Sequence, residues 1–213
     1  MSSKKDQEED KPKSGFSRRG FIRTAGATTG AIGLLEKGED EAQAATAKGV
    51  SGPGTIPITL NINGREYKAQ VEPRYTLLDT MRNSLDLTAA KRVCDRGTCG
   101  ACTVIVNGKA IYSCTTLAID SQGRQIQTLE GLSAGSRPHP LVQAFVDNDA
   151  QQCGYCTPGM VMASKAFLDR NPAPTIEQVK EGMGGNLCRC GTYMGIRKAV
   201  VQAGQVMKGA KNA

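Results

Sequence analysis

The chain has 213 residues with a formal net charge of +7, and it contains eight cysteines but one histidine. This length accommodates one large or two small domains. No apolar run reaches the length of about 18 residues typical of a membrane span, so we expect no membrane-spanning helix. One histidine excludes a Rieske-type cluster, which needs two imidazoles, and argues against a histidine-rich zinc enzyme.

Residues 1–47 differ in composition from the rest of the chain. Arg18-Arg19 precedes a modest apolar stretch at residues 24–35, and small residues at 42–47 offer cleavage sites. This pattern resembles a bacterial twin-arginine export signal and predicts a periplasmic protein. The acidic run at residues 36–41 is atypical of such a signal. The alternative is a polar arm with a chance arginine pair on a cytoplasmic protein.

The positive net charge of the chain comes entirely from the residues that follow this arm. Residues 1–47 contain eight basic and eight acidic side chains, so the whole net charge of +7 falls on the remainder. A basic balance can indicate nucleic-acid binding. Here the basic residues are scattered, without aromatic interleaving and without a helix-turn-helix or RNA-binding motif. We therefore expect no nucleic-acid partner, and attribute the charge to an acidic partner surface or to solubility.

A strand pattern follows the Gly- and Pro-containing linker at residues 48–55. Residues 58–62 alternate between apolar and polar, and residues 66–71 alternate in the same way. Between them Asn63-Gly64 is a strong signal for a tight hairpin turn. The sequence therefore predicts a β-hairpin as the first element after the linker.

The next segment predicts one helix and further strands. Thr76, with an aspartate three residues later, is typical of a helix start. A Gly- and Cys-rich loop occupies residues 93–102, and a buried strand is predicted at 103–106 before a second turn at Asn107-Gly108. A last strand is predicted at 125–129. Short strands around one helix indicate an α+β unit of the β-grasp type.

Helical periodicity begins at Pro140. Thr157-Pro158 predicts an N-cap followed by proline at the first helical position. Thr175, with a glutamine three residues later, predicts a capping box, and a last helix is expected from Thr192 onward. We predict four short helices in an antiparallel bundle over about residues 138–208.

The predicted domain organisation has four parts. Residues 1–47 form the export signal and residues 48–55 the linker. Residues 56–132 form a β-grasp domain, and residues 133–213 form an all-α domain built as a four-helix bundle. The predicted fold class is therefore α+β, with the helical domain following the β-grasp domain.

The eight cysteines divide into two sets of four. The first is Cys94-x4-Cys99-x2-Cys102-x11-Cys114, and the second is Cys153-x2-Cys156-x31-Cys188-x1-Cys190. The C-x4-C-x2-C run has the ligand spacing of plant-type [2Fe-2S] proteins. Gly97 and Gly100 allow the backbone to curl close to the sulfurs and to point N–H groups at them. The first set therefore predicts a [2Fe-2S] cluster.

The second set of cysteines is made of two close pairs. Cys188 and Cys190 are poorly placed to bridge each other, because a disulfide needs a narrow geometry. This pair and the pair Cys153 and Cys156 each precede a predicted helix, whose N-terminus favours thiolates and an anionic cluster. We therefore predict that the two pairs together make a second four-thiolate site.

Two other uses of the cysteines compete with this interpretation. Four disulfides would suit an oxidising compartment, although a twin-arginine signal is typical of proteins that load cofactors before export. Structural zinc is held by C-x2-C pairs, but the x4-x2 loop and the C-x-C pair fit a zinc ribbon poorly. Iron–sulfur clusters are the favoured interpretation.

Other candidate residues point to no chemistry in this chain. His139 is interpreted as a packing or helix-capping residue rather than a ligand or base. Residues 182–185 lack the Lys-Ser/Thr of a phosphate-binding loop, so nucleotide binding is not predicted. No Ser/His/Asp set or carboxylate pair is apparent. We expect no catalytic residue in this chain.

Three cysteine-containing stretches, residues 94–104, 152–160 and 185–193, carry a family resemblance. With both quartets and the residues between them in this order, the sequence resembles the small iron–sulfur subunit of the xanthine oxidase or molybdenum hydroxylase family. The resemblance covers about residues 56–207. The export signal makes the chain most similar to the periplasmic aldehyde oxidoreductase and isoquinoline 1-oxidoreductase branches.

The resemblance implies two [2Fe-2S] clusters and a large partner subunit that holds a molybdopterin cofactor and hydroxylates aldehydes or N-heterocycles. It implies that electrons reach the helical-domain cluster first and the ferredoxin-like cluster second. It also implies that Gln152 and Cys190 lie against the pterin, and that the loop of residues 94–102 faces the next carrier, a flavin (FAD) subunit or a cytochrome. The alternative function is a stand-alone ferredoxin-like carrier without a molybdenum partner.

Overall fold

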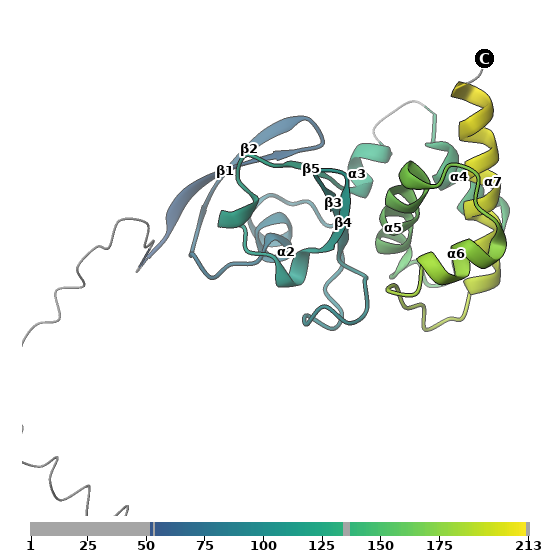
Figure 1. Cartoon of the computed structure of the whole chain (residues 1–213). Coiled ribbons are helices and arrows are strands. Elements are labelled where there is room, and N and C mark those ends of the chain that lie inside the picture. The colour runs from purple at the N-terminus through teal and green to yellow at the C-terminus, as the bar shows by residue number, and fades with distance from the viewer. Residues whose placement is uncertain (1–51, 53, 134–136, 212–213) are drawn as a thin grey trace, which may run out of the picture. The chain divides into compact units, whose positions relative to one another are not determined.

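The computed structural model describes residues 52, 54–133 and 137–211. The predicted export signal and most of the predicted linker lie outside the described residues. Residues 50–213 form one compact unit, in which a sheet-containing part is followed by a helical part (Figure 1). None of the helices described combines the length and apolar character that crossing a membrane requires.

The predicted hairpin is confirmed. Strands β1 (Ile56–Ile62) and β2 (Arg65–Val71) pair antiparallel, with Ile56 opposite Val71. Asn63 and Gly64 at the turn both have positive φ, at 53° and 76°. Such a turn matches the right-handed twist of the strands, which is why Asn-Gly is favoured there. Alternate residues of β1 are buried, so one face of the hairpin closes the core.

The helix start predicted at Thr76 is also confirmed. The Thr76 hydroxyl accepts a hydrogen bond from the Asp79 N–H at 3.0 Å, and the Asp79 carboxylate accepts one from the Thr76 N–H at 3.3 Å. This capping box opens the short helix α2 (Leu77–Asp79), which continues as a π-helical turn, η1 (Thr80–Ser84). Leu77 and Leu78 are fully buried and anchor α2 in the core beside the sheet.

Three further strands complete a five-stranded mixed sheet. They are β3 (Thr103–Val106), β4 (Lys109–Tyr112) and β5 (Gln125–Gln127), and the strand order is β2-β1-β5-β3-β4. β5 runs parallel to β1 and antiparallel to β3. All four residues of β3 are buried, as predicted.

The strand predicted to extend to Leu129 ends two residues earlier. The N–H of Thr128 donates to the side chain of Asn63 at 2.9 Å instead of joining a strand ladder. Leu129 then begins a short helix, α3 (Leu129–Leu132). Asn63 thus serves both the hairpin turn and the exit of the chain from the sheet.

The helical part contains α4 (Pro140–Asp147), α5 (Thr157–Arg170), α6 (Ile176–Gly182) and α7 (Tyr193–Lys211). Thr175 caps α6 in the predicted capping box.

The cap predicted for α5 was wrong by one residue. Cys156 is the N-cap, Thr157 is the first helical residue, and Pro158 is the second. The N–H of Thr157 donates to the carbonyl of Gly154 at 3.3 Å in the turn that carries the cysteines, so this turn sets the start of α5.

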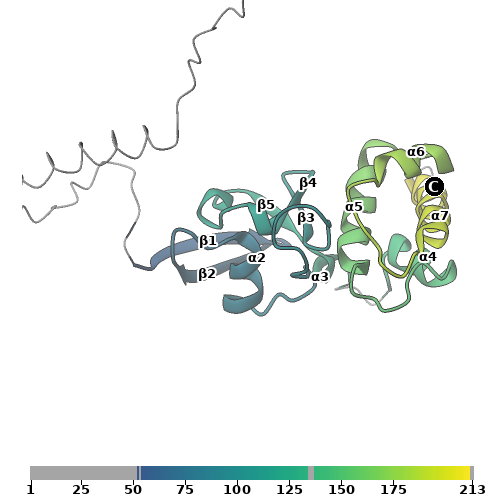
Figure 2. The same cartoon turned by 90° about the horizontal axis from the view of Figure 1, so that it is seen from below.

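Hydrophobic packing holds the helices together and joins them to the sheet. Helix α7 buries residues at helical spacing against the other helices: Ile196, Ala199, Val200 and Ala203. Helix α5 packs on strand β3 through Met162 and Ala166, which contact Ile105. Figure 2 shows α5 as the long helix that lies nearest the sheet. Helix α5 therefore joins the helical part to the sheet-containing part.

Candidate metal centres

The first cysteine quartet gathers at one end of the sheet. Cys94, Cys99 and Cys102 lie in the loop before β3, and Cys114 lies in a 3-10 turn, η2 (Ser113–Thr115), directly after β4. The thiols of Cys94 and Cys99 lie close together, as do those of Cys102 and Cys114. Cys94 also lies close enough to Cys114 to influence its ionisation. The fold thus brings the four thiols together as two pairs.

The loop reaches this arrangement through left-handed backbone conformations. Gly97 and Gly100 have φ of 73° and 72°, a region that glycine adopts without steric cost. The curl points the N–H of Thr98 at the sulfur of Cys94, 3.4 Å away. Such a donor stabilises negative charge on sulfur.

The second quartet lies where two long helices begin. Cys153 and Cys156 precede and cap α5, while Cys188 and Cys190 lie in the loop before α7. The thiols of Cys156 and Cys188 lie close together, and Cys153 is near Cys156. The backbone of Cys190 lies close enough to the sulfur of Cys188 to favour its ionisation. Three of the four thiols thus lie near one another, with the backbone of the fourth beside them.

Each quartet contains one thiol that ionises readily and one that does not. Hydrogen bonds from the Thr98 side chain and the Arg96 backbone lower the pKa of Cys94 to about 6. Burial works against ionisation of Cys188, yet hydrogen bonds from Thr192 lower its pKa to about 7. Burial raises the pKa of Cys114 and of Cys156 to about 12. A bound metal deprotonates a coordinating thiol outright, so all of these groups can serve as thiolate ligands.

The donor set fits iron–sulfur chemistry. Both sites offer thiols, the ligand type that holds iron–sulfur clusters. Within the described part of the chain, no group of three or more His, Cys, Asp or Glu side chains is already arranged to hold a metal ion. Structural zinc takes four ligands around one ion. A [2Fe-2S] cluster instead divides four thiolates between two irons. The paired thiols of the first quartet match that division.

The two quartets are adjacent. The N–H of Leu187 donates to the carbonyl of Cys99 at 2.9 Å. A cavity of about 480 Å³ lies between the loops, and its walls include cysteines of both quartets: Cys99, Cys153, Cys156 and Cys188. Its remaining walls combine apolar side chains with two tyrosines and the charged Arg189.

The two residues assigned to a pterin contact are both accessible. Gln152 is exposed at the start of the Cys153 loop, and Cys190 is half-buried. Neither is enclosed by the described residues of this chain.

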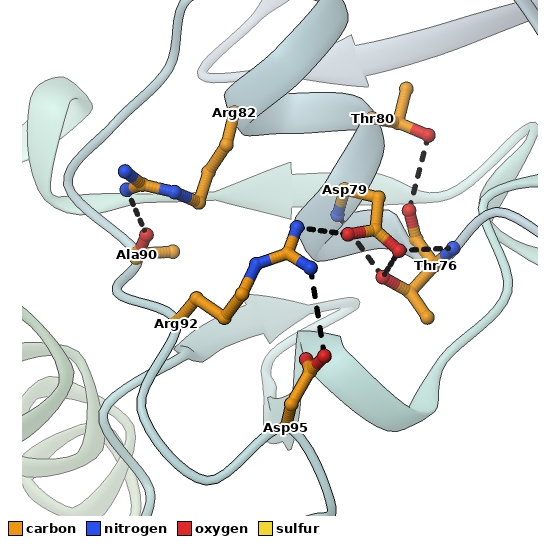
Figure 3. A network of polar contacts seen from close by, with 7 residues as sticks. All are labelled: Thr76, Asp79, Thr80, Arg82, Ala90, Arg92 and Asp95. Atoms are coloured by element: carbon orange, nitrogen blue, oxygen red, sulfur yellow. Dashed lines mark hydrogen bonds and ion pairs between the residues drawn. The ribbon is translucent and has the colours of Figure 1, made fainter.

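A polar network that the sequence did not reveal braces the first loop (Figure 3). Arg92 forms a close ion pair with Asp79 and a longer one, at 3.5 Å, with Asp95. Burial opposes ionisation of Asp79, but hydrogen bonds from Thr76 and Arg92 hold the pKa of its carboxyl below the ordinary value. Arg82 donates to the carbonyl of Ala90 at 2.8 Å. The segment leading into Cys94 is thereby tied to α2 and η1.

His139 has the capping role predicted for it. Its Nδ1 accepts a hydrogen bond from the N–H of Leu141 at 3.2 Å at the start of α4. Burial, together with the positive charge of Lys165, lowers the pKa of the imidazole. The neutral ring that this cap requires is therefore favoured.

Comparison with known proteins agrees with this geometry. Residues 60–130 match the family described as 2Fe-2S iron-sulfur cluster binding domain, and residues 128–201 match the [2Fe-2S] binding domain family. The aldehyde oxidoreductase iron-sulfur-binding subunit of Escherichia coli (strain K12) is 37% identical, over 91% of this chain and 90% of that protein. The nicotinate dehydrogenase small FeS subunit of Eubacterium barkeri is 47% identical, over 68% of this chain and 92% of that protein.

A solved structure of a related oxidoreductase has a similar fold. A chain in the crystal structure of quinoline 2-oxidoreductase from Pseudomonas putida 86 superposes with a TM-score of 0.71 and 38% sequence identity, covering 74% of this chain and 98% of that one. Two matched cluster-binding domains and relatives of nearly full length define the family. The chain belongs to the small iron–sulfur subunits of the xanthine oxidase or molybdenum hydroxylase family, with a ferredoxin-like domain followed by a helical domain.

Proposed function

We propose that this chain relays electrons from a molybdopterin site on a large partner subunit to an external acceptor. When bound, two [2Fe-2S] clusters supply carriers that take up and release one electron at a time. The observation that carries the proposal is the pair of thiol quartets whose loops are joined by the hydrogen bond from Leu187 to Cys99. Substrate chemistry is assigned to the partner.

The residues of this chain hold the carriers and shape their surroundings. The ligands proposed for the ferredoxin-like domain are Cys94, Cys99, Cys102 and Cys114. Those proposed for the helical domain are Cys153, Cys156, Cys188 and Cys190. The N-terminus of α5 lies directly after Cys156, and its free N–H groups favour negative charge at the second site.

The finer architecture follows the same proposal. We take residues 56–132 as a β-grasp domain and residues 133–213 as a helical domain in which α4 to α7 form an antiparallel four-helix bundle. The mixed sheet that packs on α2 supports the first assignment. The contacts of α7 with α4, α5 and α6 support the second.

The names of the relatives suggest the class of substrate. Their names specify an aldehyde, nicotinate and quinoline, so we propose that the partner oxidises an aldehyde or an N-heterocycle. Gln152 and Cys190, both accessible, are proposed to face the pterin. The loop of residues 94–102 is proposed to face the next carrier, either an FAD subunit or a cytochrome.

Export through a twin-arginine signal in residues 1–47, to the periplasm, is part of the proposal. The match to the Escherichia coli subunit covers 91% of this chain, more than residues 50–213 alone make up, so the similarity extends into the N-terminal arm. N-terminal sequencing of the protein from its native cell tests this point. A mature N-terminus near residue 47 is expected, and an intact Arg18-Arg19 would contradict export with cleavage.

Purification from the native cell under mild conditions tests the proposed function. The expected result is co-purification with a large subunit, with molybdenum and iron in the same fraction. A monomer with full iron content would instead favour the stand-alone ferredoxin-like carrier. A preparation with zinc or disulfides and no iron would exclude both.

A further inference from the structure

The two cluster-binding domains approach each other through three glycines, Gly100, Gly159 and Gly185. A Cβ atom added at any of them would lie within about 2.4–2.6 Å of an atom of the opposite domain. Real Cβ atoms essentially never come that close to another heavy atom, so something would have to shift. We call these glycines, together with Asn186, the inter-domain seam.

Asn186 is the central side chain of the inter-domain seam. It is 6% exposed, and its Nδ2 donates to the carbonyl of Gly100 at 2.9 Å and to the hydroxyl of Thr103 at 3.1 Å. Asn186 belongs to the loop that carries Cys188, whereas Gly100 follows Cys99 directly. A Cβ atom on Gly100 would lie 2.6 Å from the Asn186 amide, so the amide fills the space that glycine leaves.

Gly159 brings the helical domain onto the same stretch of backbone from another side. It lies in the first turn of α5, and a Cβ atom there would lie 2.4 Å from the carbonyl oxygen of Gly100 and 2.9 Å from that of Ala101. Further along α5, Met162 packs against Ile105. The start of α5, which Cys156 caps, is therefore pressed against the loop of the first quartet.

Two hydrogen bonds flank Asn186 on either side. The hydroxyl of Tyr112 donates to the carbonyl of Gly185 at 2.8 Å. The N–H of Leu187 donates to the carbonyl of Cys99 at 2.9 Å. Three consecutive residues of the helical domain, 185–187, thus each bond to the ferredoxin-like domain.

We propose that Asn186 is a positioning residue, and that the inter-domain seam sets the separation between the two clusters and so the rate of electron exchange between them. This inference rests on the proposed function, because it requires both clusters. Electron tunnelling falls exponentially with distance, and the dipolar coupling of two electron spins falls with its inverse cube. Because a Cβ atom at any of the three glycines would clash with the opposite domain, these glycines let the two domains pack more closely than other residues would.

The test uses the assembled, iron-loaded protein and the variants Asn186→Ala and Gly159→Ala. The first removes the buried donor, and the second inserts a methyl group between the domains. Alanine is the better helix former, so Gly159→Ala would strengthen α5 if the inter-domain seam were unimportant. The matched control is Gly209→Ala in α7, where a Cβ atom meets nothing within 4 Å.

Two quantities are measured after chemical reduction: the dipolar interaction between the two reduced clusters by pulsed electron paramagnetic resonance (EPR), and the exchange rate by flash reduction. In both seam variants we expect both cluster signals with full iron, a weaker dipolar interaction and exchange slowed several-fold. Gly209→Ala should match wild type. Intact signals with unchanged interaction and rate in the seam variants would overturn the proposal.

If Asn186→Ala or Gly159→Ala loses a cluster, a milder variant still tests the proposal. Tyr112→Phe removes one hydroxyl at the rim of the inter-domain seam and is expected to weaken the dipolar interaction measurably. An unchanged interaction in Tyr112→Phe would then count against the proposal. Wild-type protein without two [2Fe-2S] signals would contradict the proposed function itself, so the two failures are distinguishable.

Discussion

The backbone N–H of Leu187 donates to the carbonyl oxygen of Cys99 over 2.9 Å. Leu187 directly precedes Cys188, so a single hydrogen bond separates a residue of the first quartet from the chain leading into the second. The same bond fixes the loops mechanically, because both partners are backbone atoms and no side-chain rotation can break it. The two candidate centres are thus linked both by position and through bonds.

The two quartets are expected to hold separable clusters. Cys190→Ser should abolish or distort the helical-domain signal in EPR while the signal of the Cys94 quartet stays intact. Cys114→Ser should do the reverse, because removing one thiolate affects only the cluster that it ligates. Loss of both signals in either variant would instead indicate one interdependent site or misfolding.

Removal of iron should expose unequal thiol reactivity. The thiolate is the nucleophile, and the pKa of Cys94 is about 6 whereas those of Cys114 and Cys156 are about 12. After chelation, iodoacetamide at pH 7 should therefore modify Cys94 well before Cys114 and Cys156, as followed by mass spectrometry. Iron-loaded protein is the control and should be protected at all three positions. Equal reactivity of the three thiols would contradict the arrangement of hydrogen bonds around Cys94.

Asp79 is expected to stabilise the ferredoxin-like domain by about 1 kcal/mol through its cap and its arginine partner. Because the folded-state pKa is lowered from 3.8, this contribution is present above about pH 4 and is lost as the pH falls through the folded pKa. Asp79→Asn should lower the thermal midpoint equally at pH 7 and pH 5. Glu72→Gln, which removes an exposed partner of Arg74, should have little effect. Equal effects of the two substitutions would contradict a special role for Asp79.

The His139 cap should make stability depend on pH near neutrality. The imidazole pKa is lowered from 6.5, so the neutral, capping form is retained above that value. Its contribution is lost as the pH falls through the folded pKa, because protonated Nδ1 cannot accept from Leu141. His139→Ala should cost about 1 kcal/mol at pH 8.

The matched variant is His139→Asn, which offers a cap acceptor without a titrating group. It should flatten the pH dependence of the thermal midpoint between pH 5 and 7. The single histidine of the chain makes its titration directly visible by NMR. A folded-state pKa above 6.5 would contradict this account.

Most of the fold could be predicted from short sequence patterns. Asn63-Gly64 and Thr76 with Asp79 act over a few residues through backbone conformation and capping, so their outcome could be predicted without tertiary information. The grouping of the cysteines was predicted from their spacing, and in the fold Cys102 lies near Cys114 and Cys156 near Cys188. The end of β5 was misplaced because a side chain 65 residues away, that of Asn63, takes the N–H of Thr128.

The inter-domain contacts had no sequence signal of their own. Asn186 stands between a glycine and a leucine in a cysteine-containing stretch, and only the fold shows that its amide meets Gly100, 86 residues earlier in the chain. The ion pair between Arg92 and Asp79 likewise joins residues 13 positions apart. Arginine and aspartate are common, so the sequence alone does not show that these two pair. Such partners are set by the packing of whole elements, which periodicity and spacing do not determine.

A reductive titration of the purified iron-loaded protein, followed by EPR with iron and zinc analysis of the same sample, tests directly whether the chain holds two separate [2Fe-2S] clusters. We expect two distinct [2Fe-2S] signals of equal spin content and an iron content that matches two clusters, with no stoichiometric zinc. A single signal, or zinc in place of iron, would contradict it.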